Sequence, residues 1–192
     1  ADSLWCGSAG LAHAIAAQEG VAPPPGLAAP LPKEAGPTVL ISASFQPVLR
    51  EQWARLRAGV PVSAVAEHAN DTEIQAAILR AAQAGCAAWF DLSPVEKITP
   101  EQAAQQLARH TAQLVAGLSK PGQLVVVGGD TLLSLCRTTG ATALLARTSI
   151  QSGWGCARLV GGKWDGVPCY SRSGAFGGPD DLLTMMGCLT AT

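Results

Sequence analysis

Runs rich in apolar residues alternate with longer amphipathic stretches along this 192-residue chain, and this order limits the folds open to it. Apolar runs occupy 38–42, 86–92 and 123–127, and a stretch with helical spacing follows each of them. Strands of this kind are covered on both faces, and their alternation with helices is typical of βα units. We therefore predict an α/β fold, with a largely parallel central sheet flanked by helices.

Local signals indicate where the helices begin. Pro47 and Pro100 stand where a first helical turn tolerates proline, and Thr99 with Gln102 has the pattern of a capping box. We expect helices over 11–19, 47–58 and 71–84, from 100 to about 115, from 132, and after Pro179. Besides the three runs above, we expect strands at 4–6 and 60–65.

The sequence pattern changes in the C-terminal third of the chain. From Ala143 to Tyr170, β-type stretches are broken by glycines, which predicts antiparallel hairpins at one edge of the sheet. A glycine-rich loop follows at 171–178. The proline-rich segment 21–37 has the composition of a surface connection, because too few residues precede it to form a domain. We expect a single domain over residues 1–192.

Composition excludes several classes of function. The formal net charge is −1 and no basic cluster occurs, which disfavours a nucleic-acid partner. No apolar run reaches the ~18 residues of a membrane span. The six cysteines form no C-x-x-C pair, so we expect reduced thiols in a cytoplasmic protein and no zinc site.

Four loops made of small residues follow predicted strands, at 7–10, 42–44, 128–131 and 173–178. Ligands of open α/β sheets bind at the carboxyl ends of the strands. Where a helix starts there, glycine leaves backbone N–H groups free to bind phosphate. A glycine can also serve only to bend the chain, but four such loops together favour an anion site.

Asp130 is the most suggestive side chain, because it directly follows an apolar strand and could orient a nucleotide or hold Mg²⁺ through water. It could instead only cap the next helix. Arg172 could stabilise phosphate charge or be an exposed hairpin residue. The hydroxyls of Ser42, Ser44 and Thr131 could donate to phosphate oxygens. The sequence contains no Walker A motif.

These motifs arrive in an order that resembles the C-terminal nucleotide-binding domain of the four-carbon acid sugar kinase family. The landmarks are GSAGLA at 7–12, SAS at 42–44 with Gln52 after it, GGDT at 128–131 and RSGAFG at 172–177. Members of the family phosphorylate threonate, erythronate and 3-oxo-tetronate acids. The resemblance implies ATP and Mg²⁺ as cofactors.

The resemblance also implies a set of site residues. Asp130 would be the catalytic residue, and no residue is assigned as a direct metal ligand. The implied nucleotide contacts are Ser42, Ser44, Gly128, Gly129, Asp130, Thr131, Arg172, Ser173, Gly174 and Gly177.

The chain departs from the family pattern at several positions. Ala43 and Ala175 stand where glycine is usual, Leu49 where threonine is usual, Arg172 where lysine is common, and Ser149 where an acid is often found. These departures leave open a catalytically silent module that binds a nucleotide or another anion for regulation. A third reading is an unrelated Rossmann-like enzyme that uses another cofactor.

In the family, a separate N-terminal domain binds the sugar acid. We expect that domain to precede residue 1, so that this chain equals the C-terminal half of a two-domain kinase. Phosphoryl transfer needs both substrates held in line, so the chain alone should be inactive. The expected partners are a nucleotide, a four-carbon sugar acid held by the other domain, and a second copy of the chain, with no membrane partner.

Overall fold

The computed structural model describes residues 9–20, 29–60, 64–66, 70–84, 87–147 and 153–190. Its centre is a seven-stranded sheet in the order β2-β3-β1-β4-β7-β6-β5. The strands are β1 (Thr38–Ser42), β2 (Ala64–Ala66), β3 (Ala88–Asp91), β4 (Gln123–Val127), β5 (Ala143–Arg147), β6 (Gly155–Val160) and β7 (Pro168–Arg172). Among the described strands, β6 is antiparallel to β5 and to β7, and all the other pairs are parallel. The predicted α/β fold, with antiparallel hairpins toward the C-terminus, is confirmed.

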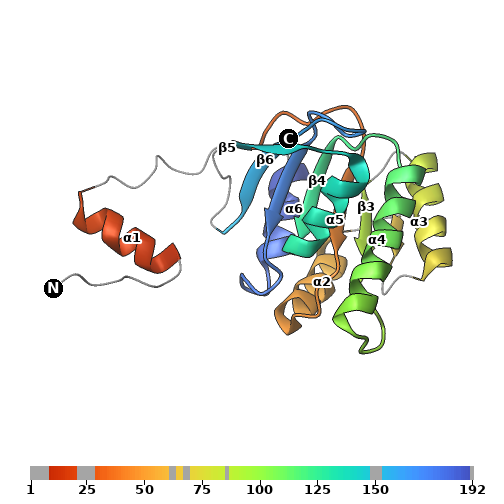
Figure 1. Ribbon diagram of the computed structural model, residues 1–192, viewed down its shortest axis with the longest axis horizontal. Helices are drawn as coiled ribbons and strands as arrows, with labels where there is room; N and C mark the ends of the chain where they lie inside the picture. The colour runs from red at the N-terminus through yellow and green to blue at the C-terminus, as the bar shows by residue number, and fades with distance from the viewer. Residues whose placement is uncertain are drawn as a thin grey trace.

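Helices cover both faces of the sheet (Figure 1). The described helices are α1 (Ala9–Gln18), α2 (Pro47–Gly59), α3 (Asp71–Ala84), α4 (Pro100–Gly117), α5 (Gly129–Thr139) and α6 (Asp181–Thr190), of which α2 to α6 pack on the sheet. Helix α4 packs between α3 and α5 on one face, and α2 packs against α6 on the other. A right-handed crossover places its helix on one face or the other according to the direction in which the chain crosses the sheet. The connection from β1 through α2 to β2 runs in one direction, and the next three connections, through α3, α4 and α5, run in the opposite direction. Helix α2 therefore lies on the other face from α3, α4 and α5. Helix α1 lies apart from the sheet.

Two apolar cores result, one on each face. Successive side chains of a strand point to opposite faces, so Val39 and Ile41 of β1 join the core under α3, α4 and α5. Leu40, between them, joins the core under α2 and α6 together with Trp53 and Met185. All five residues of β1 and of β4 are buried. The central strands are therefore fixed between two packed layers.

Most local signals are confirmed. Thr99 Oγ1 accepts a hydrogen bond from the backbone N of Gln102 at 3.2 Å, and the backbone N of Thr99 donates one to Gln102 Oε1 at 3.0 Å. Helix α5 begins at Gly129, earlier than predicted, because Gly128 makes the turn from β4 with a φ of +113°. Among the helices of the described residues, none has the length and apolar character needed to cross a membrane.

Three expectations in the N-terminal half of the chain have a different outcome. The predicted strand at 4–6 lies outside the described residues, and so does the start of the loop at 7–10. Ala9 and Gly10, which the prediction placed in that loop, belong to α1. Of the strand expected at 60–65, Val60 is instead the C-cap of α2, residues 61–63 lie outside the described residues, and β2 begins at Ala64.

Candidate functional site

The carboxyl ends of four parallel strands lie together at one edge of the sheet. The strands are in register there, so Asp91, Ser42, Val127 and Arg172 form a row across β3, β1, β4 and β7. Three of the predicted small-residue loops begin directly after this row. Because ligands of open α/β sheets bind at this edge, the loops form the candidate site.

The serine loop has one buried and one accessible hydroxyl. Ser42 is fully buried, and its Oγ accepts a hydrogen bond from Trp53 Nε1 at 2.9 Å and donates to Asp91 Oδ1 at 3.5 Å. Ser44 is only partly buried, and its Oγ accepts from the backbone N of Gln46 at 3.4 Å. Ser42 therefore supports the loop from below, and Ser44 is the hydroxyl that a ligand could reach.

The first turn of α5 is open at its N-terminus. Among the described residues no side chain caps this helix. A Cβ built on Gly129 would meet nothing within 4 Å, and Asp130 beside it is exposed. Thr131 is buried below, with its Oγ1 3.0 Å from the place of a Cβ on Gly128. Uncapped N–H groups at the positive end of a helix dipole attract anions.

The glycine-rich loop after β7 folds back onto the serine loop. Gly174 lies against Ser44, and a side chain at Gly174 would overlap the Ser44 hydroxyl. Gly177 has a φ of +90°, and a side chain there would overlap the ion pair between Arg172 and Asp181. Two glycines are therefore required by close contacts, and these contacts hold the loop at the edge of the sheet.

Arg172 is enclosed beneath this loop rather than exposed on it. Its side chain is 2% exposed and donates to Asp181 Oδ2 at 3.0 Å and to Gln52 Oε1. The guanidinium carbon lies 4.6 Å from the centre of the Trp154 ring. Burial lowers the pKa of Arg172, and the carboxylate of Asp181 opposes that effect. Gln52 also donates to the carbonyl of Gly178 at 2.8 Å, so both side chains anchor the loop.

The ten predicted nucleotide contacts thus fall into two groups. Those that are exposed or partly exposed are Ser44, Gly128, Gly129, Asp130, Ser173 and Gly177. Those that are buried are Ser42, Thr131, Arg172 and Gly174. The first group can meet a ligand directly, and the second holds the loops in place.

Sequence reasoning missed Asp91, which ends β3 and is buried. Its carboxylate accepts from the backbone N of Ser93 at 3.0 Å as well as from Ser42. The sequence does contain a signal for Asp91, because this acidic residue stands at the end of an apolar run, much as Asp130 follows one. Gln52 was noted only as a landmark, and nothing in its neighbours along the chain indicates its bond to Arg172.

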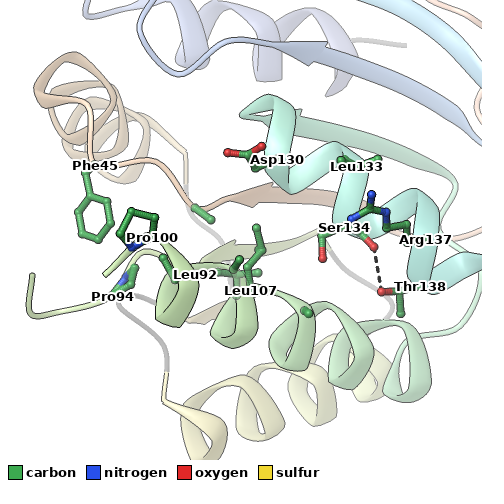
Figure 2. A pocket seen from close by; sticks show the side chains of 14 residues that line it. Phe45, Leu92, Pro94, Pro100, Leu107, Asp130, Leu133, Ser134, Arg137 and Thr138 are labelled. Carbon is green, nitrogen blue, oxygen red and sulfur yellow. Dashed lines mark hydrogen bonds between the residues drawn. The ribbon is translucent and has the colours of Figure 1, made fainter. Parts of the chain in front are cut away.

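A cavity of about 400 Å³ opens beside the serine loop, between α4 and α5 (Figure 2). Asp130 lies at its rim. Phe45, Pro94 and Pro100 form one side, and Leu133 with the polar residues of α5 forms the other. Its volume lies within the ~300–1,000 Å³ typical of ligand pockets.

The described residues contain no cluster of three or more His, Cys, Asp or Glu side chains that could hold a metal ion by themselves. Asp130 is an exposed carboxylate at the open end of α5. Magnesium in nucleotide sites keeps several waters and takes one or two carboxylates together with phosphate oxygens. The donor set therefore fits a magnesium ion that arrives with a nucleotide.

Comparison with known proteins identifies the family of the chain. Residues 39–182 match a family model described as a nucleotide-binding C-terminal domain. No curated protein matches the chain.

Solved structures share the fold. A domain of unknown function (DUF1537) from Bordetella bronchiseptica, a domain-swapped dimer with bound citrate, aligns over 80% of this chain with a TM-score of 0.60 and 23% identity. A DUF1537 protein from Haemophilus influenzae aligns over 92% with a TM-score of 0.59 and 16% identity. This chain covers 41% and 45% of those two chains, so it spans less than half of each.

Proposed function

The chain belongs to the family of nucleotide-binding C-terminal domains, and from this premise we propose that it is the ATP-binding part of a four-carbon sugar-acid kinase. Membership confirms the resemblance seen in the sequence; the kinase activity and its substrate are the proposal. One observation carries it: the uncapped start of α5, with Asp130 exposed, lies at the same edge of the sheet as the serine loop and the glycine-rich loop.

The residues have separate parts in this proposal. The backbone N–H groups of the first turn of α5, with the Ser44 hydroxyl and the loop from Ser173, donate to the phosphate oxygens. Asp130 would hold Mg²⁺ through water, and the ion would supply charge neutralisation at the phosphates. Arg172 acts by position, because Asp181 already balances its charge and the guanidinium lies beneath the loop.

Phosphoryl transfer also needs an acceptor hydroxyl in line with the terminal phosphate. By the family resemblance, the sugar acid is held by a domain N-terminal to this one, and Asp130 is the residue of this chain placed to act at the phosphates. We infer that this chain binds the nucleotide and does not transfer phosphate by itself. The dimer of the Bordetella protein supports a second copy of the chain as a further partner.

A regulatory module that binds a nucleotide or anion without catalysis is the second candidate. The enclosed state of Arg172 favours it, since the family commonly has lysine there and this guanidinium is held by Asp181 and Gln52. Phosphorylation of a four-carbon acid by the protein joined to its N-terminal domain would exclude this candidate.

Calorimetry with ATP and Mg²⁺ tests nucleotide binding. We expect the wild-type chain to bind, and Asp130→Asn to weaken binding by about 10-fold or more, the usual effect of removing an outer-sphere metal partner. Glu19→Gln is the matched control, because Glu19 is also exposed but follows α1, which lies apart from the sheet. No binding at millimolar ATP would overturn the proposal.

A further inference from the structure

The cavity between α4 and α5 opens at the same edge of the sheet as the proposed phosphate site and shares Asp130 with it. We propose that it binds the base of the nucleoside triphosphate, with the phosphates at the open end of α5. This inference rests on the proposed function and adds the position of the base.

The walls have the character that a planar base requires. Phe45, Pro94 and Pro100 present an aromatic ring and two flat apolar rings to the cavity (Figure 2). Phe45 is 42% exposed and Leu133, across the cavity, is 47% exposed. A planar ring that stacks between these two solvent-exposed apolar side chains would cover both of them. Stacking on an aromatic side chain accepts any of the bases.

The α5 wall adds polar groups along one stripe of the helix. Asp130, Ser134, Arg137 and Thr138 lie on the side of α5 that lines the cavity. The Ser134 hydroxyl lies 2.8 Å from that of Thr111, and the Thr138 hydroxyl donates to the Ser134 carbonyl at 2.8 Å. One wall is thus apolar and the other can form hydrogen bonds, as the faces and edges of a base require.

The cavity is continuous with the phosphate site through two elements. Ala43 and Phe45 line it, and Ser44 between them contacts Gly174 of the glycine-rich loop. Asp130 stands both at the rim of the cavity and in the first turn of α5. A nucleotide can therefore place its phosphates on α5 and its base in the cavity, with the ribose beside Asp130.

Alanines on α4 leave the space that the base would fill, and Ala104 is one of them. Ala104→Phe fills the cavity from an exposed helical position without touching the phosphate loops. Ala112→Phe is the matched control, because Ala112 is exposed on the same helix and does not line the cavity. Phe45→Ala is a second variant, which removes the stacking ring from an exposed loop position.

Calorimetry compares ATP with inorganic triphosphate, both with Mg²⁺, on the full 192-residue chain. We expect Ala104→Phe and Phe45→Ala to weaken ATP binding by about 10-fold or more and to leave triphosphate binding unchanged. Ala112→Phe should leave both unchanged. Thermal unfolding shows whether each variant is folded. If Ala104→Phe does not fold, the ATP and triphosphate affinities of Phe45→Ala test the base site.

The outcomes separate the two proposals. A wild-type chain that binds no ATP overturns the proposed function, and the base site with it. A wild-type chain that binds ATP, with cavity variants that bind it equally well, overturns the base site alone. Equal loss of ATP and of triphosphate also overturns the base site, because the substitutions would then have disturbed the phosphate loops.

Discussion

Gly177 shows how closely single residues are constrained at the end of β7. Its φ of +90° is a conformation that L side chains rarely adopt, and the ion pair of Arg172 and Asp181 occupies the place of a Cβ. The pair fixes the loop, and the loop covers the pair. A glycine that a sequence motif offers as a phosphate contact is thus also required by packing.

We predict that Gly177→Ala destabilises the chain more than Gly153→Ala. Gly153 also has a positive φ, of +80°, but a Cβ there would meet nothing within 4 Å, so it isolates the backbone strain. The overlap with Arg172 and Asp181 should add at least about 1 kcal/mol to the loss of unfolding free energy. Urea denaturation measures both variants, and equal losses would show that the ion pair moves aside without cost.

At the scale of elements, the packing of α4 decides both the cavity and a titratable contact. On its far side, His110 of α4 is buried against α3, with Nε2 3.2 Å from Asp71 Oδ1. Burial lowers the pKa of His110 below its ordinary value of 6.5, Arg109 acts in the same direction, and Asp71 opposes them. Desolvation is the largest of these effects, so the neutral ring is favoured.

This contact predicts a pH dependence of stability. Because the unfolded chain binds the His110 proton more tightly than the folded chain, the unfolding free energy should fall as the pH drops below about 6.5. The fall should continue until the pH passes the lower pKa of the folded state. His110→Gln should flatten this part of the profile, as urea denaturation between about pH 7.5 and 5.5 can measure. An unchanged slope would assign the dependence to other groups.

At the scale of the whole molecule, the sheet is packed on both faces and carries the candidate site at one edge. Two apolar cores lock the sheet between helices, and the carboxyl ends of β1, β3, β4 and β7 carry the candidate site. This chain covers less than half of each solved relative described above. A ligand that binds only the folded state raises its stability by mass action.

We therefore predict that ATP with Mg²⁺ raises the unfolding temperature of the chain without being consumed. At about 100 times the dissociation constant, the gain in unfolding free energy should be about 2.7 kcal/mol. Thermal unfolding and an assay for ADP, run with and without four-carbon sugar acids, measure the two effects. Formation of ADP that depends on a sugar acid would contradict the prediction, because the chain would then bind the acceptor itself.

The sequence alone was enough to predict the α/β fold, the helix that begins at Pro100 and the loops that follow the strands. These features depend on residues close together in the chain: the apolar run of β4, the capping box of Thr99 and Gln102, and the glycines at the start of α5. Short-range spacing contains this information because the backbone periods of helix and strand are local.

Only the tertiary structure decided which predicted residues reach the surface. Ser42 is bonded to Asp91, 49 positions away in the chain, and Arg172 is held by Gln52, 120 positions away. Asp91 enters the site because β3 pairs beside β1 in register. The cavity lies between α4 and α5, and no motif in either helix indicates that a cavity separates them. Contacts of this kind depend on strand order and helix packing, which no local pattern encodes.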